Sequence, residues 1–102
     1  MGFSGERLAL VPLSYLKVAN SAETAEPLSS QRVVVFGYCI SVTEEQEVKL
    51  TDGTTTLVLN AAKSGGASYA GGPHCPAWEF AKGKKVKVEG STADGHLTYV
   101  IV

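Results

Sequence analysis

From Arg32 onward the chain alternates apolar and polar residues in short segments. The segment RVVVFGYCISV (32–42) is rich in β-branched and aromatic residues. It therefore predicts a long strand, in which the internal Gly37 marks a bulge or sharp bend. In KKVKVEGS (84–91) the alternation turns Val86 and Val88 inward and the lysines outward. After a turn signal at 93–95, HLTYVIV (96–102) predicts the last strand.

Residues 44–61 predict a β-hairpin. Asp52-Gly53 is a strong turn signal between two alternating runs. The alternation places four residues inward: Val48, Leu50, Leu57 and Leu59. The glycine-rich stretch AKSGGASYAGG (62–72) that follows is interpreted as a flexible connector.

The segment PAWEFAKG (76–83) predicts a short helix before the fourth strand. Pro76 suits the first turn of a helix, and Gly83 suits the residue just past its end. Lys82 falls in the last turn, where the helix dipole favours a cation. Trp78 and Phe80 are the apolar residues of this helix, and at least one of them is expected to fill the core.

The N-terminal region, residues 1–31, lacks this clear alternation. It consists of the apolar stretch LALVPLSYL (8–16) followed by a polar run. Pro12 argues against a regular strand through the apolar stretch, which is instead expected to cross the surface as a tail or short helix. The prediction is an extension over 1–31 that packs on the domain or on a partner, and an all-β domain over 32–102.

Composition narrows the class of protein. The 102 residues, 44% hydrophobic and 19% charged, suit a single soluble globular domain. No apolar run is long enough to span a bilayer, and no secretory signal is expected. The two cysteines are then expected to be reduced and the protein intracellular, with a single Cys39–Cys75 disulfide as the alternative. A net charge of −1 is unusual for a protein that binds nucleic acid mainly through phosphates.

The order of these elements resembles the OB-fold, a five-stranded Greek-key barrel with one short helix between strands 3 and 4. The segments that carry the resemblance are the glycine-bent strand RVVVFGYCISV, the hairpin VKLTDGTTTLVL and the strand KGKKVKVEGS. The chain is also similar in size to single-OB-fold proteins such as the smallest subunits of replication protein A and of the telomere-capping CST complex. Those subunits usually continue into a C-terminal assembly helix, whereas here Val102 lies in the last strand. Three explanations of this difference stay open: the chain has been trimmed, it docks through its N-terminal segment instead, or the resemblance is one of fold alone.

The resemblance implies a nuclear, non-catalytic subunit of a single-stranded-DNA-binding complex that acts mainly through protein–protein contacts with other OB-fold subunits. The alternative is an autonomous single-strand binder. No membrane, small-molecule substrate, metal or cofactor is expected. The nucleic-acid contacts implied are Tyr38, Lys49, Thr51, Thr54, Thr56, Lys85, Lys87 and His96. The expected partner contacts are Leu8, Leu10, Val11, Leu13, Tyr15 and Leu16.

Two features weigh on the DNA-binding alternative. Lysines 82, 84, 85 and 87 form a basic stripe, but lysines also commonly protect a strand edge from aggregation. Glutamates at 44, 45 and 47 occupy the first loop, where phosphate binding would require positive charge. Strong autonomous binding is therefore not predicted.

A remote alternative is a small enzyme that uses Cys75 or a zinc ion. The possible soft ligands are Cys39, His74, Cys75 and His96, whose spacing lacks the CxxC or HxxxH pairs of zinc sites. A cysteine nucleophile needs a facing base, which an adjacent residue such as His74 rarely supplies. Cys75 is instead interpreted as lying near the start of the short helix.

Overall fold

The computed structural model describes residues 13–71 and 75–102. These ranges contain eight β-strands and no helix, so the fold is all-β as predicted. The strands are β1 (Ser14–Lys17), β2 (Val33–Ser41), β3 (Gln46–Thr51), β4 (Thr56–Ala61), β5 (Ala67–Tyr69), β6 (Trp78–Glu79), β7 (Lys87–Glu89) and β8 (Asp94–Ile101). Within the described residues no helix is long and apolar enough to cross a membrane.

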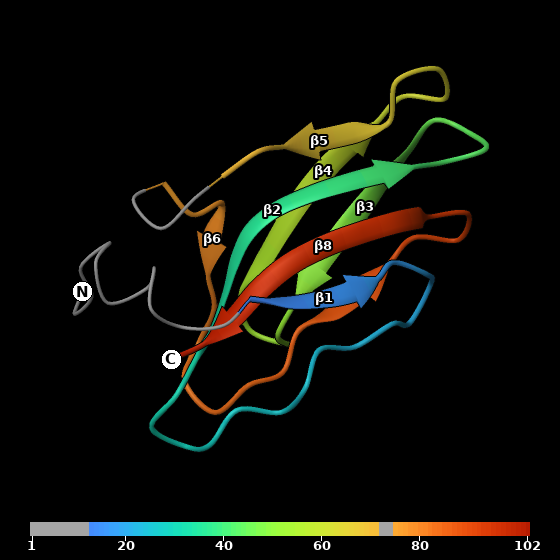
Figure 1. The fold of residues 1–102 in the computed structure, drawn as a ribbon. Coiled ribbons are helices and arrows are strands. Elements are labelled where there is room, and N and C mark those ends of the chain that lie inside the picture. The colour runs from blue at the N-terminus through green and yellow to red at the C-terminus, as the bar shows by residue number, and fades with distance from the viewer. Residues whose placement is uncertain (1–12, 72–74) are drawn as a thin grey trace.

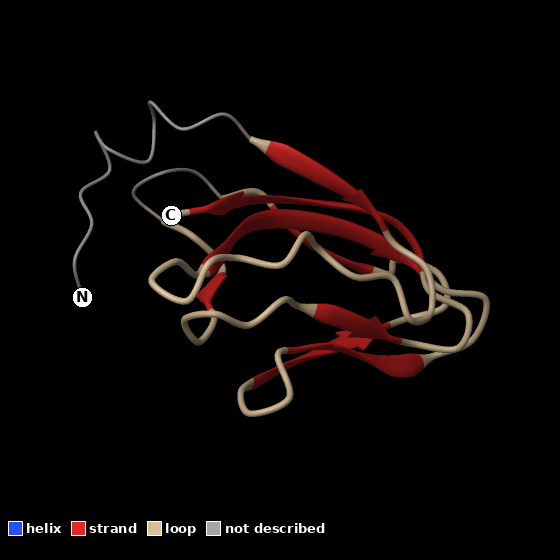
Figure 2. Ribbon diagram, turned by 90° about the horizontal axis from the view of Figure 1, so that it is seen from below, coloured by secondary structure: helices blue, strands red, loops and turns tan. Residues whose placement is uncertain are grey.

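The strands form two antiparallel sheets that lie face to face (Figures 1 and 2). The five-stranded sheet has the order β1-β8-β2-β5, with β6 also paired to β2. The three-stranded sheet has the order β4-β3-β7. The predicted closed barrel is not seen in the described ranges, because β2 pairs with β8, β5 and β6 rather than with β3. The chain changes sheets in the connection between β2 and β3, so the result is an open sandwich.

The main core lies between the sheets and follows the predicted alternation. Val33, Val35 and Ile40 of β2 point into it, as do Leu97 and Tyr99 of β8. The three-stranded sheet contributes Val48, Leu50, Leu59, Ala61 and Val88, with Val86 just before β7. Leu57 is partly buried against the same core. The inward positions predicted from period-2 alternation are therefore confirmed.

A β-bulge lies at Gly37, as the sequence predicts. The β2–β8 register passes from Val35 opposite Tyr99 directly to Gly37 opposite Thr98, which leaves Phe36 as the extra residue. A Cβ at Gly37 would lie 2.7 Å from the carbonyl oxygen of Tyr69, so this close approach favours glycine.

The hairpin predicted at Asp52-Gly53 is confirmed. It joins β3 to β4, with Thr51 directly opposite Thr56. Gly53 adopts a φ of 94°, a conformation that glycine tolerates best. The Asp52 carboxylate accepts hydrogen bonds from the backbone N–H groups of Thr54 (2.8 Å) and Thr55 (2.6 Å), which closes the turn.

The helix predicted over residues 76–83 is wrong. Trp78 and Glu79 instead form β6, opposite Val35 and Val34 of β2. Backbone bonds flank this pair: Ala77 N–H donates to Val35 at 2.8 Å, and Phe80 N–H donates to Val33 at 3.0 Å. A helix of so few residues is marginal in water, whereas the edge of β2 offers ready backbone partners. Lys82 therefore lies in no helical turn.

The aromatic pair of this segment divides between core and surface. Phe80 is buried in the main core, while Trp78 is 41% exposed. The expectation that at least one of the two fills the core is met by Phe80.

Two other segments form strands where the sequence predicted none. Ala67–Tyr69 within the predicted flexible connector is β5, which pairs with Tyr38–Ile40 of β2. Ser14–Lys17 is β1, in the apolar stretch expected to be a tail or helix, and it pairs with β8. Pro12 precedes the described residues, so β1 begins after the position that the proline restricts.

Candidate functional site

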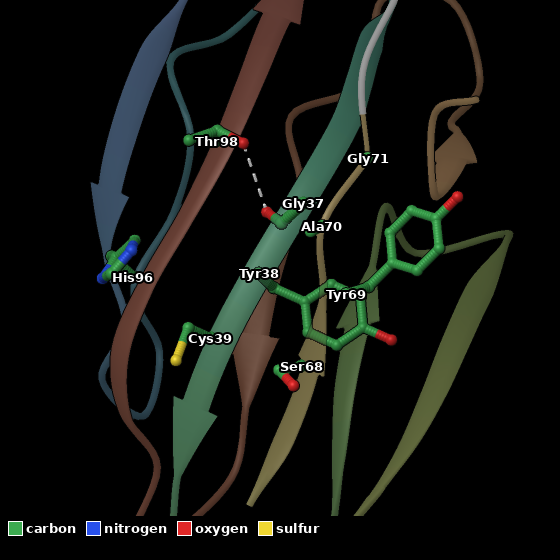
Figure 3. A pocket seen from close by; sticks show the side chains of 9 residues that line it. All are labelled: Gly37, Tyr38, Cys39, Ser68, Tyr69, Ala70, Gly71, His96 and Thr98. Atoms are coloured by element: carbon green, nitrogen blue, oxygen red, sulfur yellow. Dashed lines mark hydrogen bonds between the residues drawn. The ribbon is translucent and has the colours of Figure 1, made fainter. Parts of the chain in front are cut away.

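A hollow of about 340 Å³ lies in the five-stranded sheet around the bulge (Figure 3). It is lined by Gly37, Tyr38, Cys39, Ser68, Tyr69, Ala70, Gly71, His96 and Thr98. Two predicted contact residues, Tyr38 and His96, are among these lining residues, although 58 positions separate them in the sequence. They lie on opposite faces of the sheet, because Tyr38 packs against the main core and His96 does not. The antiparallel pairing of β2 with β8 and β5 brings the lining together.

Tyr38 and Tyr69 form a stacked pair at this hollow. They lie directly opposite one another on β2 and β5, with ring centroids 6.2 Å apart and planes at 30°. The Tyr69 hydroxyl donates to the carbonyl of Cys75 at 3.0 Å. Partial burial raises the pKa of Tyr38, and the neighbouring Tyr69 raises it further. The Tyr38 phenol therefore stays neutral near pH 7, and it supplies ring surface and a hydroxyl group rather than charge.

A row of polar side chains crosses the sheet beside the tyrosines. Cys39 of β2 lies opposite both Ser68 of β5 and His96 of β8, and His96 in turn lies opposite Lys17 of β1. Residues opposite one another in a ladder point to the same face, so these four share one surface. Ile40 and Leu97, which directly follow Cys39 and His96, point into the core. Successive side chains of a strand point to opposite faces, so this surface is the outer one.

The cation of this row is already paired. Lys17 Nζ lies 2.6 Å from Asp94 Oδ1. The hydrogen bond from Lys17 lowers the pKa of Asp94, as do the backbone N–H of Gly95 and the positive charge of Lys17. Both side chains are exposed, so the pair is weak and a competing anion could exchange with it.

The other predicted nucleic-acid residues lie on the three-stranded sheet, away from Tyr38 and His96. Thr51, Lys85 and Lys87 border a second hollow, of about 250 Å³. Its remaining lining residues are Glu23, Asp52, Gly53 and Glu89. Three carboxylates thus face two lysines, and Lys85 Nζ is 3.1 Å from Glu23 Oε2. Lys49 likewise lies opposite Glu89 in the β3–β7 ladder. This balance of charge does not favour phosphate binding.

The predicted threonines take part in the hairpin itself. Thr56 Oγ1 donates to Thr51 Oγ1 at 3.0 Å, and the backbone N–H of Thr54 bonds to Asp52. Asp52 also accepts a hydrogen bond from Ala81 N–H at 2.8 Å, which ties the hairpin to the segment after β6. These contacts give the hairpin residues a structural role.

Apolar side chains are exposed along β1, the outermost strand of the five-stranded sheet. Tyr15 is 71% exposed and Leu13, just before the strand, is 46% exposed. Leu16 differs, because it packs against the main core. The remaining expected partner residues, Leu8, Leu10 and Val11, lie outside the described residues.

The cysteines are both exposed and free. In the described part of the chain no three His, Cys, Asp or Glu side chains come close enough to hold a metal ion. His74, one of the four ligands considered, lies outside that part.

Ser68, Tyr69 and Thr98, which also line this hollow, were not predicted from the sequence. The signal in ASY is an alternation over only three residues, hidden among glycines. Its strand character depends on pairing with β2, which is a tertiary interaction.

Comparison with protein-family models, curated proteins and solved structures found no match.

Proposed function

We propose that this protein is a small non-catalytic subunit of a single-stranded-DNA-binding assembly and acts mainly through protein–protein contacts. The observation that supports this best is the exposed edge at β1. Among the described residues β1 pairs only with β8, which leaves the backbone groups on its other side available to a further strand. Exposed Leu13 and Tyr15 add apolar surface at the same edge. An open edge with apolar side chains suits the addition of a partner strand.

The DNA-binding context is supported by the resemblance of the strand order to the OB-fold. Strands β2, β3, β4, β7 and β8 follow one another as expected, with the bulge in the first and the tight turn between the second and third. We propose that the sandwich is an opened relative of that barrel. A nuclear location and other OB-fold subunits as partners belong to the same proposal.

The distribution of charge supports a docking role over direct DNA binding. The lysines at 49 and 85 have carboxylates beside them, and the protein carries a net charge of −1. Affinity for nucleic acid depends strongly on uncompensated positive charge. The protein–protein contacts at β1 need no such charge.

The second candidate function is direct binding of single-stranded nucleic acid by the outer face of the five-stranded sheet. Tyr15 lies opposite Thr98, which lies opposite Gly37, and the neighbouring row carries Lys17 and His96. An exposed aromatic ring beside a cation such as Lys17 is the usual arrangement for stacking bases and holding phosphates. This face, rather than the basic stripe near β7, favours that alternative.

The test is recovery of the assembly on a tagged chain in its source cell. Leu13→Ser with Tyr15→Ser removes the apolar side chains at β1. Leu28→Ser is the control, since Leu28 is an exposed leucine elsewhere, at 69% against 71% for Tyr15. We expect other single-strand-binding subunits to copurify with the unaltered chain and the control but not with the double variant. Recovery without any DNA-binding subunit, or equal recovery with all three chains, would contradict the proposal.

A further inference from the structure

Strand β4 forms one border of the three-stranded sheet and carries no device that would prevent further pairing. Among the described residues it pairs only with β3, in a register without a bulge. Its sequence, TLVLNA, contains no charged residue and no proline. Exposed edge strands usually carry a lysine, a proline or a bulge, because an unprotected edge pairs readily with another strand. The composition of β4 is therefore that of a strand that accepts a neighbour.

The other border of the same sheet, β7, is covered by its own chain. Ser21 N–H donates to the carbonyl of Val88 at 2.8 Å, and Val88 N–H donates to the carbonyl of Ala22 at 2.8 Å. Lysines 85 and 87 lie along this border as well. In the described part of the chain, β4 is thus the border of this sheet that is open to a further strand.

The β3–β4 ladder determines which backbone groups of β4 point outward. Asp52 N–H donates to the carbonyl of Thr55 at 3.1 Å, so the next pair along the hairpin, Thr51 and Thr56, is a non-hydrogen-bonded one. The two hydroxyl oxygens of that pair lie 3.0 Å apart, as expected for the closer kind of pair. Because the two kinds of pair alternate, every second residue of β4 directs its backbone N–H and C=O groups away from β3: Thr56, Val58 and Asn60.

This outward row is complementary to itself. In an antiparallel pair of two β4 strands centred on Val58, Val58 lies opposite its own copy and Thr56 lies opposite Asn60. Each of these pairs exchanges both backbone hydrogen bonds, because all three residues direct their groups outward. The two valines, each 44% exposed in the single chain, then cover one another. On the inner face the partly buried Leu57 lies opposite Leu59 of the second copy, and the junction brings no charged side chains opposite one another.

We propose that two copies of this chain associate through β4, antiparallel and centred on Val58, so that their two small sheets become one continuous sheet. A second copy fits this edge because the edge is neutral and matches itself about a two-fold axis. The association stops at a dimer, since β7 at the opposite border is covered by its own chain. This inference goes beyond the proposed function, which places the partner contact at β1 on the other sheet.

Disulfide cross-linking tests both the occupant and the register. Val58→Cys is introduced into a full chain that carries Cys39→Ser and Cys75→Ser, since both native thiols are exposed. Opposite Cα atoms of a hydrogen-bonded antiparallel pair lie about 5.5 Å apart, within the range that a disulfide spans. We expect mild oxidation to convert the Val58→Cys chain to a covalent dimer. Thr56→Cys is the matched control on the same strand and should stay uncross-linked, because its own copy lies about 13 Å further along the strand. Equal cross-linking of both chains, or of neither, would overturn the proposal.

Sedimentation equilibrium of the unaltered chain gives an independent readout. We expect a dimer that dissociates on dilution. Val58→Lys should raise its dissociation constant about tenfold or more, because two lysines would lie opposite one another at the junction. Leu28→Lys, at an exposed leucine elsewhere, should leave the constant unchanged, and circular dichroism checks that both variants fold. A chain that is monomeric at every concentration, or a dimer that Val58→Lys leaves intact, would refute the proposal. Neither result bears on the recovery of the assembly through β1, so the two proposals fail separately.

Discussion

Asp52 is the residue whose replacement tests the packing of the hairpin most sharply. Its carboxylate accepts backbone hydrogen bonds from Thr54, Thr55 and Ala81 at 2.6–2.8 Å. Partial burial by itself would raise the pKa of Asp52, but these bonds outweigh it and lower the pKa below its ordinary 3.8. In Asp52→Asn one acceptor becomes an NH₂ group that faces the Ala81 N–H.

Loss of one hydrogen bond to a charged group costs about 1.5–3 kcal/mol of the free energy of unfolding. Asp52→Asn should therefore lower this free energy by about 2 kcal/mol, which for a domain of this size is about 10 °C in Tm. The contribution of Asp52 to the free energy of unfolding also depends on pH. Because folding lowers the pKa of Asp52, its contribution is present above the unfolded-state pKa of about 4 and is lost as the pH falls through the folded pKa.

The assay is urea unfolding followed by circular dichroism at pH 7 and at stepwise lower pH. The difference in the free energy of unfolding between the wild-type protein and Asp52→Asn should be largest near neutral pH and should disappear below about pH 4. Asp94→Asn is the matched control, since the pKa of Asp94 is also lowered but only by the exposed Lys17 and a local N–H. An Asp52→Asn protein as stable as wild type at pH 7, or a gap that persists unchanged in acid, would refute the reasoning.

Three further predictions concern the bulge, the N-terminal connection and β6. Gly37→Ala should destabilise the protein in thermal unfolding and loosen β5, because the new Cβ would lie 2.7 Å from the carbonyl oxygen of Tyr69. Gly65→Ala is the control: its Cβ would meet nothing within 4 Å, so the same measurement should show no change. Thr24→Val should lower the free energy of unfolding by about 1–3 kcal/mol, because the buried Val86 N–H loses the Thr24 hydroxyl that accepts its hydrogen bond at 3.0 Å. Thr24→Ser keeps a hydroxyl at this position and should retain most of the wild-type stability. The fluorescence of the single tryptophan, Trp78, should be quenched readily by acrylamide in the folded protein; strong protection would contradict its placement on an edge strand.

The sequence was most informative where local pattern and tertiary structure agree. The Gly37 bulge, the Asp52-Gly53 turn and the inward valines at 48, 86 and 88 were all predictable, because each follows from alternation or from glycine geometry. The 76–83 segment carries good helix-end signals, yet it forms β6, since pairing with β2 outweighs the weak propensity of a single short turn of helix. The strand at 67–69 was hidden for the same reason.

The candidate site was predictable only in part. Tyr38 and His96 were both predicted as nucleic-acid contacts and both line the same hollow, but Tyr38 packs against the main core whereas His96 lies on the outer face. Lys49 and Lys87 were also predicted as nucleic-acid contacts, but they lie on the other sheet. The chain crosses between sheets after β2, and no local pattern reveals which strands pair across such a connection. The carboxylate partner of Lys85, Glu23, lies 62 residues away in sequence and was equally hidden.

The central claim is that this protein docks into a single-strand-binding assembly and does not itself hold the DNA. Fluorescence anisotropy of a labelled single-stranded oligonucleotide, titrated with the isolated chain at low and moderate salt, tests it most directly. The account predicts no appreciable binding at either salt concentration, because Lys49 and Lys85 have carboxylates beside them. Tight binding that weakens steeply with salt would contradict the account and favour the second candidate function, direct binding of single-stranded nucleic acid.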